Sequence, residues 1–563
     1  MALKKSDKKS KESKNNPKYI FVVGGVISGV GKGVAASSIG KILQDRDLKV
    51  TAIKIDPYIN IDAGTMNPTE HGEVYVTDDG DECDQDMGNY ERFLGITLSR
   101  DNYMTTGRVY QSVIEKERNL EYGGKCVEVV PHVPLEIIER IKKAQKNAKA
   151  DVVIIEIGGT VGEYQNILFL EAARMMKIKH PGDVLFVMVS YLPVPSKVGE
   201  MKTKPTQYAV RTLNASGIQP DIIVARAEKP LDEKRKQKLA MFCNVPANHI
   251  VSAPDIESIY DVPVNFEKEK LSELICEFLG ATCKPQNKKS AGEWKKFVSR
   301  VHHSKDTVNI AMVGKYFETG DYVLSDSYLS VIEAIKYSAY SQNKKPVLTW
   351  ISSIDFETKK RKISELSNYD GIIVPGGFGT RGVEGIISTI KYARENGIPY
   401  FGLCYGMQLM VIEYARNVLK LRDAHTLEVN PKSKSLVINI METQKSLVAT
   451  HKMGGTMRLG AYDTDIAEGT HAFAAYKSKK ISERHRHRYE VNGDYIKKFE
   501  ESGLVFSGKS QRGELMEIAE LPKKIHPFML GTQFHPEYKA RPLAPHPLFT
   551  AFIKSIVDKK NKK

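Results

Sequence analysis

The sequence predicts an α/β fold, with two doubly wound and mostly parallel sheets that follow one another along the chain. Short apolar strands alternate with helical stretches in both halves, which is the pattern of βαβ units. A chain of 563 residues is too long for one hydrophobic core, and two domains of about 250 residues each are the simplest division. Between the halves, Gly280, Pro285 and the polar run 286–290 predict a linker.

Positive charge is concentrated at the two ends of the chain. Of the net charge of +15, residues 1–18 hold +5, from seven lysines against Asp7 and Glu12, and residues 554–563 hold +4, from five lysines against Asp558. Blocks of like charge usually stay disordered, so we expect solvated tails and no nucleic-acid partner. The predicted division is a basic tail over 1–18, a domain over 19–280, a linker over 281–306, a domain over 307–556 and a basic tail over 557–563.

The composition favours a globular enzyme without a membrane span. The hydrophobic fraction of 41% is typical of globular chains, and no run approaches the roughly 18–20 apolar residues that cross a membrane. Residues 1–18 are too polar for a secretory signal. The six cysteines show no metal-ligand spacing and no disulfide-scaffold density, so we expect reduced thiols and a cytoplasmic location.

A glycine-rich turn between a strand and a helix organises the first half. Residues 19–23 are an apolar run typical of a buried strand, the turn occupies 24–33, and residues 34–43 are expected to be helical. Unpaired backbone N–H groups and a helix N-terminus favour a bound phosphate, and Lys32 adds a positive charge. Phosphate loops usually continue with Ser or Thr, which binds magnesium. Gly33 follows here, so another residue must hold the metal. The alternative is a tight turn without a ligand.

Charged residues occur on two further expected strands of the first half. Lys54 lies near the end of the strand 50–55, and Glu156 lies inside the apolar strand 151–157. A buried carboxylate is costly without a partner, so we expect Glu156 to bind a metal. The alternative is a core carboxylate paired with a cation. The remaining strands of this half are expected at 184–190 and 221–225.

Two polar segments of the first half lie between these strands. The acidic run 78–86 does not fit an EF-hand, and we expect most of its carboxylates to be exposed. In the segment 202–207, Pro205 excludes a continuous helix. Lys202 and Lys204 flank this turn and suit a second anionic ligand.

The second half repeats the alternation of strands and helices and contains a nucleophile elbow. The elbow is Gly402-Leu403-Cys404-Tyr405-Gly406, in which the glycines make room for a nucleophile on a strained turn. Strands are expected at 307–313, 371–374 and 399–403, and helices at 325–340 and 383–395.

A base and an orienting carboxylate for this thiol lie near the C-terminus. His535 can take the proton of Cys404, and Glu537 can hold the imidazole in the required tautomer. The amide of Tyr405 and the glycines 376 and 377 can supply oxyanion donors. The alternative is a small core cysteine without chemistry.

Apart from its tails, the chain resembles the CTP synthase family. In that family a Rossmann-like phosphate-loop synthetase domain precedes a class I glutamine amidotransferase domain of flavodoxin-like fold. The motifs that carry the resemblance are GGVISGVGKG at 24–33, KIDPYIN at 54–60, EIGGTVG at 156–162, KTKPTQ at 202–207, FCNVP at 242–246, PGGFG at 375–379, RGVEG at 381–385, GGTMRLG at 454–460 and ERHRHRYE at 483–490.

The resemblance implies that ATP phosphorylates O4 of UTP and that ammonia displaces this phosphate to give CTP. Lys32 and Lys54 match the lysines beside the transferring phosphate, and Asp86 and Glu156 match two Mg²⁺ ligands, which would replace the missing hydroxyl. His71 lies in a segment that the family uses near the ammonia path. The ATP positions are Gly29, Val30, Gly31, Lys32, Gly33, Val34 and Asp86. The UTP and CTP positions are Ser28, Glu163, Gln165, Lys202, Thr203, Lys204, Thr206, Gln207 and Lys238.

In the second half the resemblance implies a Cys404–His535–Glu537 triad that releases ammonia from L-glutamine. Phe378, Arg381 and Gly382 match a lid associated with activation by GTP. The family also implies a homotetramer, and assembly into filaments is compatible with it. The glutamine-holding positions are Gly377, Tyr405, Gly406, Met407, Gln408, Glu428 and Arg488.

The chain departs from the family pattern after Gly162. The family usually has Asp-Ile-Glu there, where its acids face the pyrimidine nucleotide, and this chain has Glu163-Tyr164-Gln165. Gln165 keeps hydrogen-bonding capacity but lacks the charge, so feedback inhibition by CTP is expected to be weaker or to depend differently on CTP concentration. The sequence around Glu428 also differs locally.

Two other functions fit parts of the sequence. An ATP-dependent amidotransferase with another acceptor fits the motifs, but an uncharged acceptor has no use for the segment 202–207 and Lys238. A nucleotide switch of the ParA type, assembling on nucleic acid through the basic tails, leaves Cys404 without a role and predicts salt-dependent DNA binding. A filament-forming scaffold is a third interpretation, and it can coexist with catalysis. The sequence therefore favours glutamine-dependent CTP synthesis.

Overall fold

The computed structural model describes residues 16–197, 199–280, 283–315, 318–319, 322–323, 325–449 and 454–561. These residues form two compact units. Unit 1 takes the described residues of Met1–Pro57 and Val109–Lys288, and unit 2 takes those of Tyr58–Arg108 and Lys289–Lys563. The predicted tail over 1–18 lies outside the described residues as far as residue 15, and Lys18 begins the first strand.

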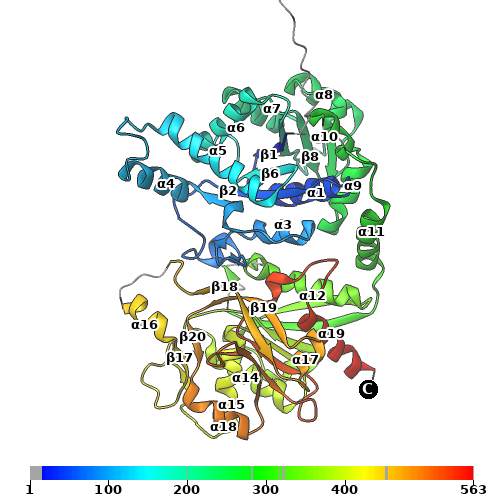
Figure 1. The fold of residues 1–563 in the computed structure, drawn as a ribbon. Helices are drawn as coiled ribbons and strands as arrows, with labels where there is room; N and C mark the ends of the chain where they lie inside the picture. The colour runs from blue at the N-terminus through cyan, green and yellow to red at the C-terminus, as the bar shows by residue number, and fades with distance from the viewer. Residues whose placement is uncertain are drawn as a thin grey trace, which may run out of the picture. The chain divides into compact units, whose positions relative to one another are not determined.

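Unit 1 is a parallel sheet with helices around it (Figure 1). Its strands are β1 (Lys18–Gly25), β2 (Val50–Asp56), β6 (Val152–Ile157), β7 (Val184–Tyr191), β8 (Ile222–Ala227) and β9 (Ile250–Pro254). They lie in the order β2-β6-β1-β7-β8-β9, and all neighbours are parallel. The strands are apolar and buried, as in sheets with helices on both faces. The helices are α1 (Lys32–Gln44), α4 (Thr106–Arg118), α5 (Val129–Ala148), α6 (Ile167–Lys179), α7 (Lys204–Ala215), α8 (Glu233–Cys243), α9 (Val262–Lys268) and α10 (Leu271–Leu279).

Unit 2 contains a sheet that is half parallel and half antiparallel. The parallel strands are β10 (Thr307–Gly314), β13 (Lys345–Ser352), β14 (Gly371–Val374), β15 (Tyr400–Leu403) and β23 (Met529–Thr532). Their order, β13-β10-β14-β15-β23, is the 2-1-3-4-5 order of flavodoxin-like folds. The sheet continues with β22 (Met516–Leu521), β21 (Val505–Ser510), β18 (Arg458–Ile466) and β19 (Lys480–His487), each antiparallel to its neighbours. The prediction of two mostly parallel α/β domains in series is confirmed.

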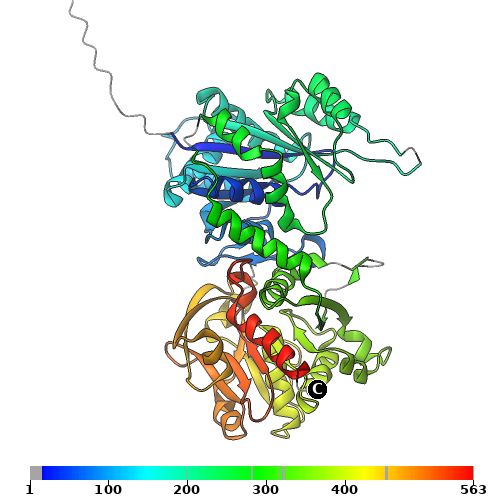
Figure 2. The ribbon, with the colours of Figure 1, turned by 90° about the vertical axis from the view of Figure 1, so that its right-hand side faces the viewer.

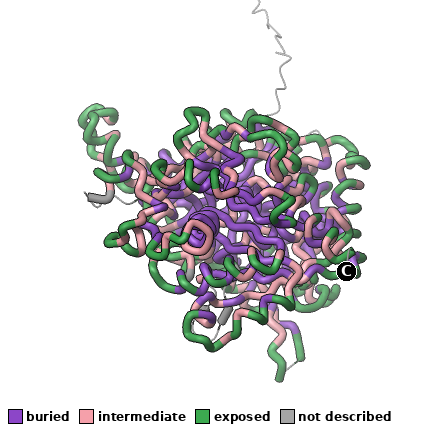
Figure 3. Tube along the Cα trace, turned by 90° about the horizontal axis from the view of Figure 1, so that it is seen from below, coloured by how far each residue is buried: buried purple, intermediate pink, exposed green. Residues whose placement is uncertain are grey.

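Helices cover the sheet of unit 2, and apolar side chains between them form its core. Ile372 and Val374 of the sheet pack with Ile390 and Met407 of the helices, all fully buried. In Figure 3 the buried stretches, in purple, are surrounded by exposed green segments. The main helices are α11 (Lys288–His303), α12 (Leu329–Ser341), α13 (Ser353–Glu357), α14 (Val383–Glu395), α15 (Tyr405–Asn417), α16 (Glu442–Ala449), α17 (His471–Tyr476), α18 (Gly493–Glu501) and α19 (Pro547–Lys560). The short strands are β11 (Glu318–Thr319), β12 (Tyr322–Val323), β16 (His425–Thr426), β17 (Leu436–Ile440) and β20 (Tyr489–Val491).

The segment 58–108 belongs to unit 2, whereas the sequence analysis placed it in a domain over 19–280. Its elements are α2 (Pro68–His71), β3 (Tyr75–Val76), β4 (Glu82–Cys83), α3 (Asp86–Leu94) and β5 (Tyr103–Thr105). The physical reason is a set of buried polar contacts with the C-terminal half of the chain. Arg486 on β19, for example, donates a 2.8 Å hydrogen bond to the buried carboxylate of Glu82.

Two other regions differ from the expected organisation. The predicted linker over 281–306 contains α11, because Ala291, Trp294, Phe297 and Val298 are spaced to bury one helix face. The predicted basic tail over 557–563 starts inside α19, the red helix that leads to the C-terminus in Figure 2. Glycine, proline and polar residues led to the linker prediction and a block of lysines led to the tail prediction, whereas helical periodicity decides the structure of both regions.

The expectation of reduced thiols is wrong for one cysteine pair. Cys276 of α10 forms a disulfide with Cys283, with their Cα atoms 6.0 Å apart. The count and spacing of cysteines do not show that the chain after α10 brings Cys283 back to that helix. Cys83, Cys126, Cys243 and Cys404 are free thiols. Among the described residues, no helix combines the length and apolar character needed to span a membrane.

Candidate active sites

The glycine-rich turn of unit 1 lies between β1 and α1. Gly29 and Gly31 have φ angles of +69° and +87°, in the left-handed region that glycine adopts without strain. Gly31 is the N-cap of α1, so the first helical turn presents N–H groups that have no partner within the helix. Lys32 is buried, and its Nζ donates a 2.7 Å hydrogen bond to the carbonyl of Gly159. A lysine cation beside a helix N-terminus is an anion-binding arrangement.

Lys54 and Glu156 form a buried ion pair near the carboxyl ends of two neighbouring strands. They are paired in register in β2 and β6, and Lys54 Nζ lies 3.0 Å from Glu156 Oε1. Asp56 Oδ1 lies 3.7 Å from the same ammonium. Glu156 is only 1% exposed, so its charge requires a cation. The structure therefore shows the ion pair that was the alternative interpretation of Glu156. A carboxylate at this end of the sheet is also the kind of ligand that Mg²⁺ prefers.

Asp86, the other predicted magnesium ligand, lies in unit 2 at the start of α3. Its backbone N–H donates a 2.8 Å hydrogen bond to Asp84, and its Oδ1 accepts one of 3.2 Å from Asn89. Within the described ranges, no three His, Cys, Asp or Glu side chains are grouped as a metal site. The pairing of Asp86 with Glu156 on one magnesium ion stays a prediction.

The segment 202–207 leads directly into α7. The helix begins at Lys204, and Pro205 lies in its first turn, where a proline is tolerated because that N–H has no helical partner. The prediction that Pro205 excludes a helix is therefore wrong from Lys204 onward. Lys202 precedes the helix and pairs with Glu200 at 2.7 Å.

Cys404 of unit 2 occupies a strained turn between β15 and α15. Its φ angle is +50°, which is unfavourable for a residue with a side chain. Two glycines allow the turn. A Cβ on Gly402 would lie 2.7 Å from the backbone of Gly406, and one on Gly406 would lie 2.4 Å from the carbonyl oxygen of Val374. This is the geometry of a nucleophile elbow.

His535 and Glu537 lie beside this thiol as an oriented base. His535 Nδ1 is 2.7 Å from Glu537 Oε1, so it is the protonated nitrogen that donates to the carboxylate. The other ring nitrogen, Nε2, is buried and has no hydrogen-bond partner among the described residues. Burial disfavours the imidazolium, but the charges of Glu537 and Cys404 outweigh burial and raise the pKa of His535 to about 10. The raised pKa favours the protonated form of the imidazole.

Further hydrogen bonds fix the two reacting side chains. Gln533 Nε2 donates to Cys404 Sγ over 3.6 Å, and the backbone N–H of Cys404 donates to the carbonyl of Thr532 over 2.6 Å. The backbone N–H of His535 donates to the carbonyl of Arg484 over 2.8 Å. The catalytic groups are thus attached to β23 and β19 rather than to a free loop.

A pocket of about 470 Å³ opens at Cys404 and His535. Charged groups of both signs lie in its wall, among them Glu428 and Arg488. Glu428 Oε1 accepts a 2.7 Å hydrogen bond from the N–H of Gly379, and burial raises the pKa of this carboxyl. Arg488 is held by Gln444. The other lining residues that bear on the site are Gly376, Gly377, Phe378, Tyr405, Gln408, Tyr489, Glu537 and Tyr538, with Gly64, Thr65, Met66, Pro68, Glu73 and Val74 from the segment 58–108. A carboxylate and a guanidinium in one pocket suit an amino acid.

Comparisons with known proteins match nearly the whole sequence. A family model described as "CTP synthase N-terminus" matches residues 18–281, and one described as "Glutamine amidotransferase class-I" matches residues 323–555. The CTP synthase of Pyrococcus abyssi is 50% identical over 548 residues, which are 97% of this chain and 99% of that protein. The chain belongs to the CTP synthase family. The CTP synthase of Bacillus subtilis is 46% identical and is covered over its full length, with 97% of this chain aligned. A glutaminase domain of Trypanosoma brucei CTPS, solved with bound acivicin, is 36% identical and covers 45% of this chain and 94% of its own, with a TM-score of 0.41.

Most of the positions that the CTP synthase resemblance assigned to glutamine lie in the pocket. Gly377, Tyr405, Gln408, Glu428 and Arg488 line it. Gly406 and Met407 are not among its lining residues; Gly406 permits the elbow, and the Met407 side chain is part of the hydrophobic core. Of the three lid positions, Phe378 lines the pocket, whereas Arg381 is exposed and Gly382 is the N-cap of α14.

Sequence reasoning missed Lys315, which lies at the edge of this site. Its Nζ donates a 2.6 Å hydrogen bond to the carbonyl of Gly379 and one of 3.2 Å to Tyr405 Oη. Burial disfavours the ammonium, and although Glu428 acts against this, the pKa of Lys315 is lowered to about 8. The sequence contained a signal for this residue, because Lys315 directly follows the apolar strand β10 and charged residues at the carboxyl ends of such strands often bind ligands.

Gly376 provides a direct test of the glutaminase geometry. A Cβ at this position would lie 2.9 Å from His535 Cε1. We expect Gly376→Ala to displace the imidazole and to lower the kcat of glutamine hydrolysis by about 100-fold. Glutamate release measures this. Gly292→Ala on α11, where a Cβ meets nothing within 4 Å, is the matched control. An unchanged kcat in Gly376→Ala would contradict the geometry.

Proposed function

We propose that the chain forms CTP from UTP, with ATP as phosphoryl donor and L-glutamine as nitrogen source. Membership of the CTP synthase family over nearly the full chain is the observation that carries this proposal. The coexistence of a phosphate-binding turn and an oriented thiol in one chain supports it. The test is ATP consumption that depends on UTP, measured with glutamine or with ammonium. Equal ATP consumption without UTP would contradict the proposal.

In the glutaminase reaction, Cys404 attacks the side-chain amide carbon of glutamine. The amides of Tyr405 and Gly377 are the proposed donors to the oxyanion. His535 then gives its proton to the departing nitrogen, and ammonia leaves as the C–N bond breaks and a thioester remains. Water, deprotonated by His535, hydrolyses the thioester to glutamate and restores the thiol. Glu537 keeps the imidazole oriented through both steps.

In the synthetase reaction, the γ-phosphate of ATP passes to O4 of UTP, and ammonia then displaces it from C4. Phosphoryl transfer needs positioning and charge neutralisation more than covalent help. Lys32 and the amides of residues 29–34 are proposed to hold the phosphates, and Lys54 to approach the transferring group. Asp86 and Glu156 are the proposed ligands of a Mg²⁺ ion, which would neutralise phosphate charge when bound. The segment 202–207 and Lys238 are proposed to bind the UTP triphosphate.

Regulation and assembly belong to the same proposal. We expect activation by GTP through Phe378, Arg381 and Gly382, and assembly into a homotetramer, as the family resemblance implies. GTP titration of glutamine hydrolysis and light scattering would measure these two properties.

Feedback inhibition by CTP is expected to be weak in this chain. Gln165 is neutral, and its Nε2 donates a 2.7 Å hydrogen bond to Glu163, whose other oxygen accepts from the N–H and hydroxyl of Thr160. In Gln165→Glu the added carboxylate cannot donate this bond and restores the acidic character of the family pattern. We expect CTP to inhibit the variant at lower concentration than the wild type. Inhibition curves that coincide would contradict this prediction.

A further inference from the structure

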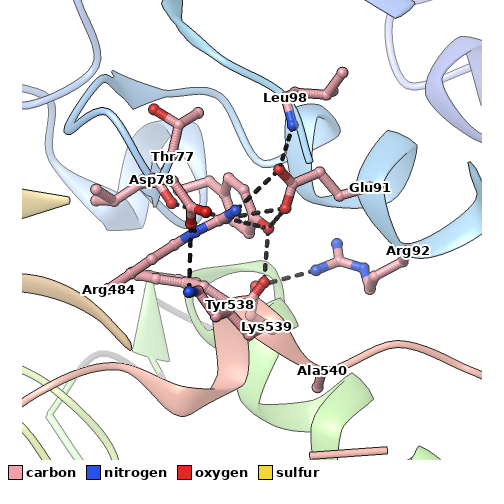
Figure 4. Close-up of polar contacts among 12 residues, drawn as sticks. Thr77, Asp78, Glu91, Arg92, Leu98, Arg484, Tyr538, Lys539 and Ala540 are labelled. Carbon is pink, nitrogen blue, oxygen red and sulfur yellow. Dashed lines mark hydrogen bonds and ion pairs between the residues drawn. The ribbon is translucent and has the colours of Figure 1, made fainter. Parts of the chain in front are cut away.

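An ion-pair network whose central groups, Glu91, Arg484 and Tyr75, are fully buried joins the segment 58–108 to the C-terminal half of unit 2 (Figure 4). At its centre the Glu91 carboxylate on α3 accepts two hydrogen bonds from Arg484 on β19, of 2.9 and 3.0 Å. It accepts a third, of 2.6 Å, from Arg541. The Tyr75 hydroxyl and the backbone N–H of Leu98 donate to the same carboxylate. Every lone-pair direction of Glu91 is therefore engaged by a donor.

The network combines charges of both signs. Arg484 and Arg541 pair with Glu91, and Asp78 accepts from Arg484 Nε and lies 3.7 Å from Lys539 Nζ. Burial raises the pKa of Glu91, but the two arginines outweigh burial and lower it. The expectation that most carboxylates of the acidic run 78–86 are exposed is wrong, because several of them have arginine partners: Asp78 pairs with Arg484, Asp81 with Arg108 and Glu82 with Arg486. A buried ion pair that has all its hydrogen bonds is rigid, and losing one partner leaves an uncompensated charge.

Tyr75 and Arg541 also contact the turn at residues 536–539, which directly follows the catalytic base His535. The Tyr538 carbonyl accepts a 2.8 Å hydrogen bond from Arg541 Nη1, and it lies 2.8 Å from the Tyr75 hydroxyl. The Tyr538 hydroxyl donates over 3.0 Å to the carbonyl of Val74. The Tyr538 ring stacks on the His535 imidazole, with centroids 5.1 Å apart and planes inclined by 16°. Tyr538 therefore fixes the plane of the imidazole, and the network fixes Tyr538.

The backbone of β19 provides a second connection. The Arg484 carbonyl accepts the N–H of His535 over 2.8 Å, and the Arg486 carbonyl lies 3.7 Å from Cys404 Sγ. The arginine side chains of these two residues reach Glu91 and Glu82 of the segment 58–108. β19 thus contacts Cys404 and His535 through its backbone. Through its arginine side chains it contacts the buried carboxylates of Glu82 and Glu91.

We propose that Glu91 is a positioning residue for glutamine hydrolysis. Through Arg484, Arg541 and Tyr75 it holds Tyr538, and with it the His535 imidazole, in line with Cys404. The inference rests on the proposed roles of Cys404, His535 and Glu537. It assigns to a residue of the N-terminal half of the sequence a role in the chemistry of the C-terminal half.

The principal test is Glu91→Gln in the full chain. The amide has the shape of the carboxylate but no charge, and it cannot accept from Arg484 and Arg541 as before. We expect the kcat of glutamine hydrolysis to fall by about 100-fold, with the KM for glutamine changed by less than about threefold, because the base is displaced and the substrate contacts are not. CTP formation from ammonium should persist, since it does not use His535.

Glu413→Gln is the matched control for loss of stability. Glu413 is also fully buried in unit 2 and accepts three hydrogen bonds from Arg394, of 2.8 to 3.1 Å. This pair joins α14 to α15 and is separate from the turn that carries His535. We expect Glu413→Gln to lower the thermal unfolding temperature as Glu91→Gln does, with glutamine hydrolysis unchanged. Equal loss of glutamine hydrolysis in both variants would show a structural role and overturn the proposal.

Variants of Tyr538 test whether its ring positions the His535 imidazole, as the proposal requires, even if Glu91→Gln does not fold. Tyr538→Phe keeps the ring on the imidazole and loses only the hydroxyl, so we expect it to retain more of the kcat than Tyr538→Leu, which removes the stacked ring and should lose about 100-fold. Equal kcat values for these two variants, or a folded Glu91→Gln with wild-type kcat, would overturn the proposal. Absence of glutamine hydrolysis in the wild-type chain would instead contradict the proposed function.

Discussion

Replacing Cys404 with alanine is expected to abolish CTP formation from glutamine while sparing CTP formation from ammonium. Cys404 supplies the electron pair that attacks the amide, and neither His535 nor Glu537 can replace it. The loss of a nucleophile from a catalytic triad costs on the order of 10⁶-fold in kcat, so glutamine hydrolysis should fall below detection. Free ammonia reaches the synthetase reaction without the thioester, so the ammonium-dependent rate should stay within about twofold, as for an additive change at a distant site.

The measurement is CTP formation with each nitrogen source, together with glutamate release. Cys243→Ala is a suitable control, because Cys243 is a buried free thiol on α8 of unit 1. Loss of both activities in Cys404→Ala, with cooperative unfolding retained, would contradict an ammonia supply that is independent of the thiol. Retention of both would contradict the nucleophile assignment.

Replacing Lys32 with alanine is expected to abolish CTP formation from both nitrogen sources. Lys32 carries the positive charge at the N-terminus of α1 and is held at 2.7 Å from the Gly159 carbonyl. The charge that develops on a transferring phosphoryl group needs such a cation, and removing one costs about 10³-fold or more. Glutamine hydrolysis itself should continue, because Cys404 and His535 lie in the other unit.

The measurements are CTP formation with glutamine and with ammonium, glutamate release, and ATP consumption. Lys49→Ala, at an exposed lysine that directly precedes β2, is the control for loss of one positive charge in unit 1. Ammonium-dependent CTP formation at the wild-type rate in Lys32→Ala would contradict the phosphate role of this lysine. The two variants together separate the two reactions. Cys404→Ala should remove glutamine hydrolysis, and Lys32→Ala should remove the synthetase reaction.

Much of the fold could be predicted from the sequence because its strands are buried on both faces. A parallel strand between two layers of helices is an uninterrupted apolar run, and the runs at 19–23 and 371–374 correspond to β1 and β14. The helix expected at 383–395 is α14 with the same bounds. The elbow was also predictable, because the nucleophile and the glycines that permit its strained turn are adjacent in sequence.

Predictions from local polarity failed where contacts distant in sequence, or the position of a residue within a helix, decide the structure. Lys288 to Ser290 suggested a linker, yet they begin α11, whose buried face includes Trp294 packed on Phe93 with ring centroids 5.3 Å apart. The acidic run 78–86 suggested an exposed loop, because sequence shows the charges and does not show the arginines that neutralise them. Pro205 suggested a break, and it lies instead in the first turn of α7, where the missing N–H has no cost.

The local chemistry of this protein can be read from residue order: a phosphate-binding turn with Lys32, a thiol on an elbow, and a histidine two residues before a carboxylate. Each of these features depends on neighbours in the chain. Folding is needed to place the segment 58–108 in the unit of the thiol, to bring Lys315 to Tyr405, and to pair Glu91 with Arg484 across 393 positions of sequence. Burial makes such charges depend on their partners, and the partners are brought together only by folding.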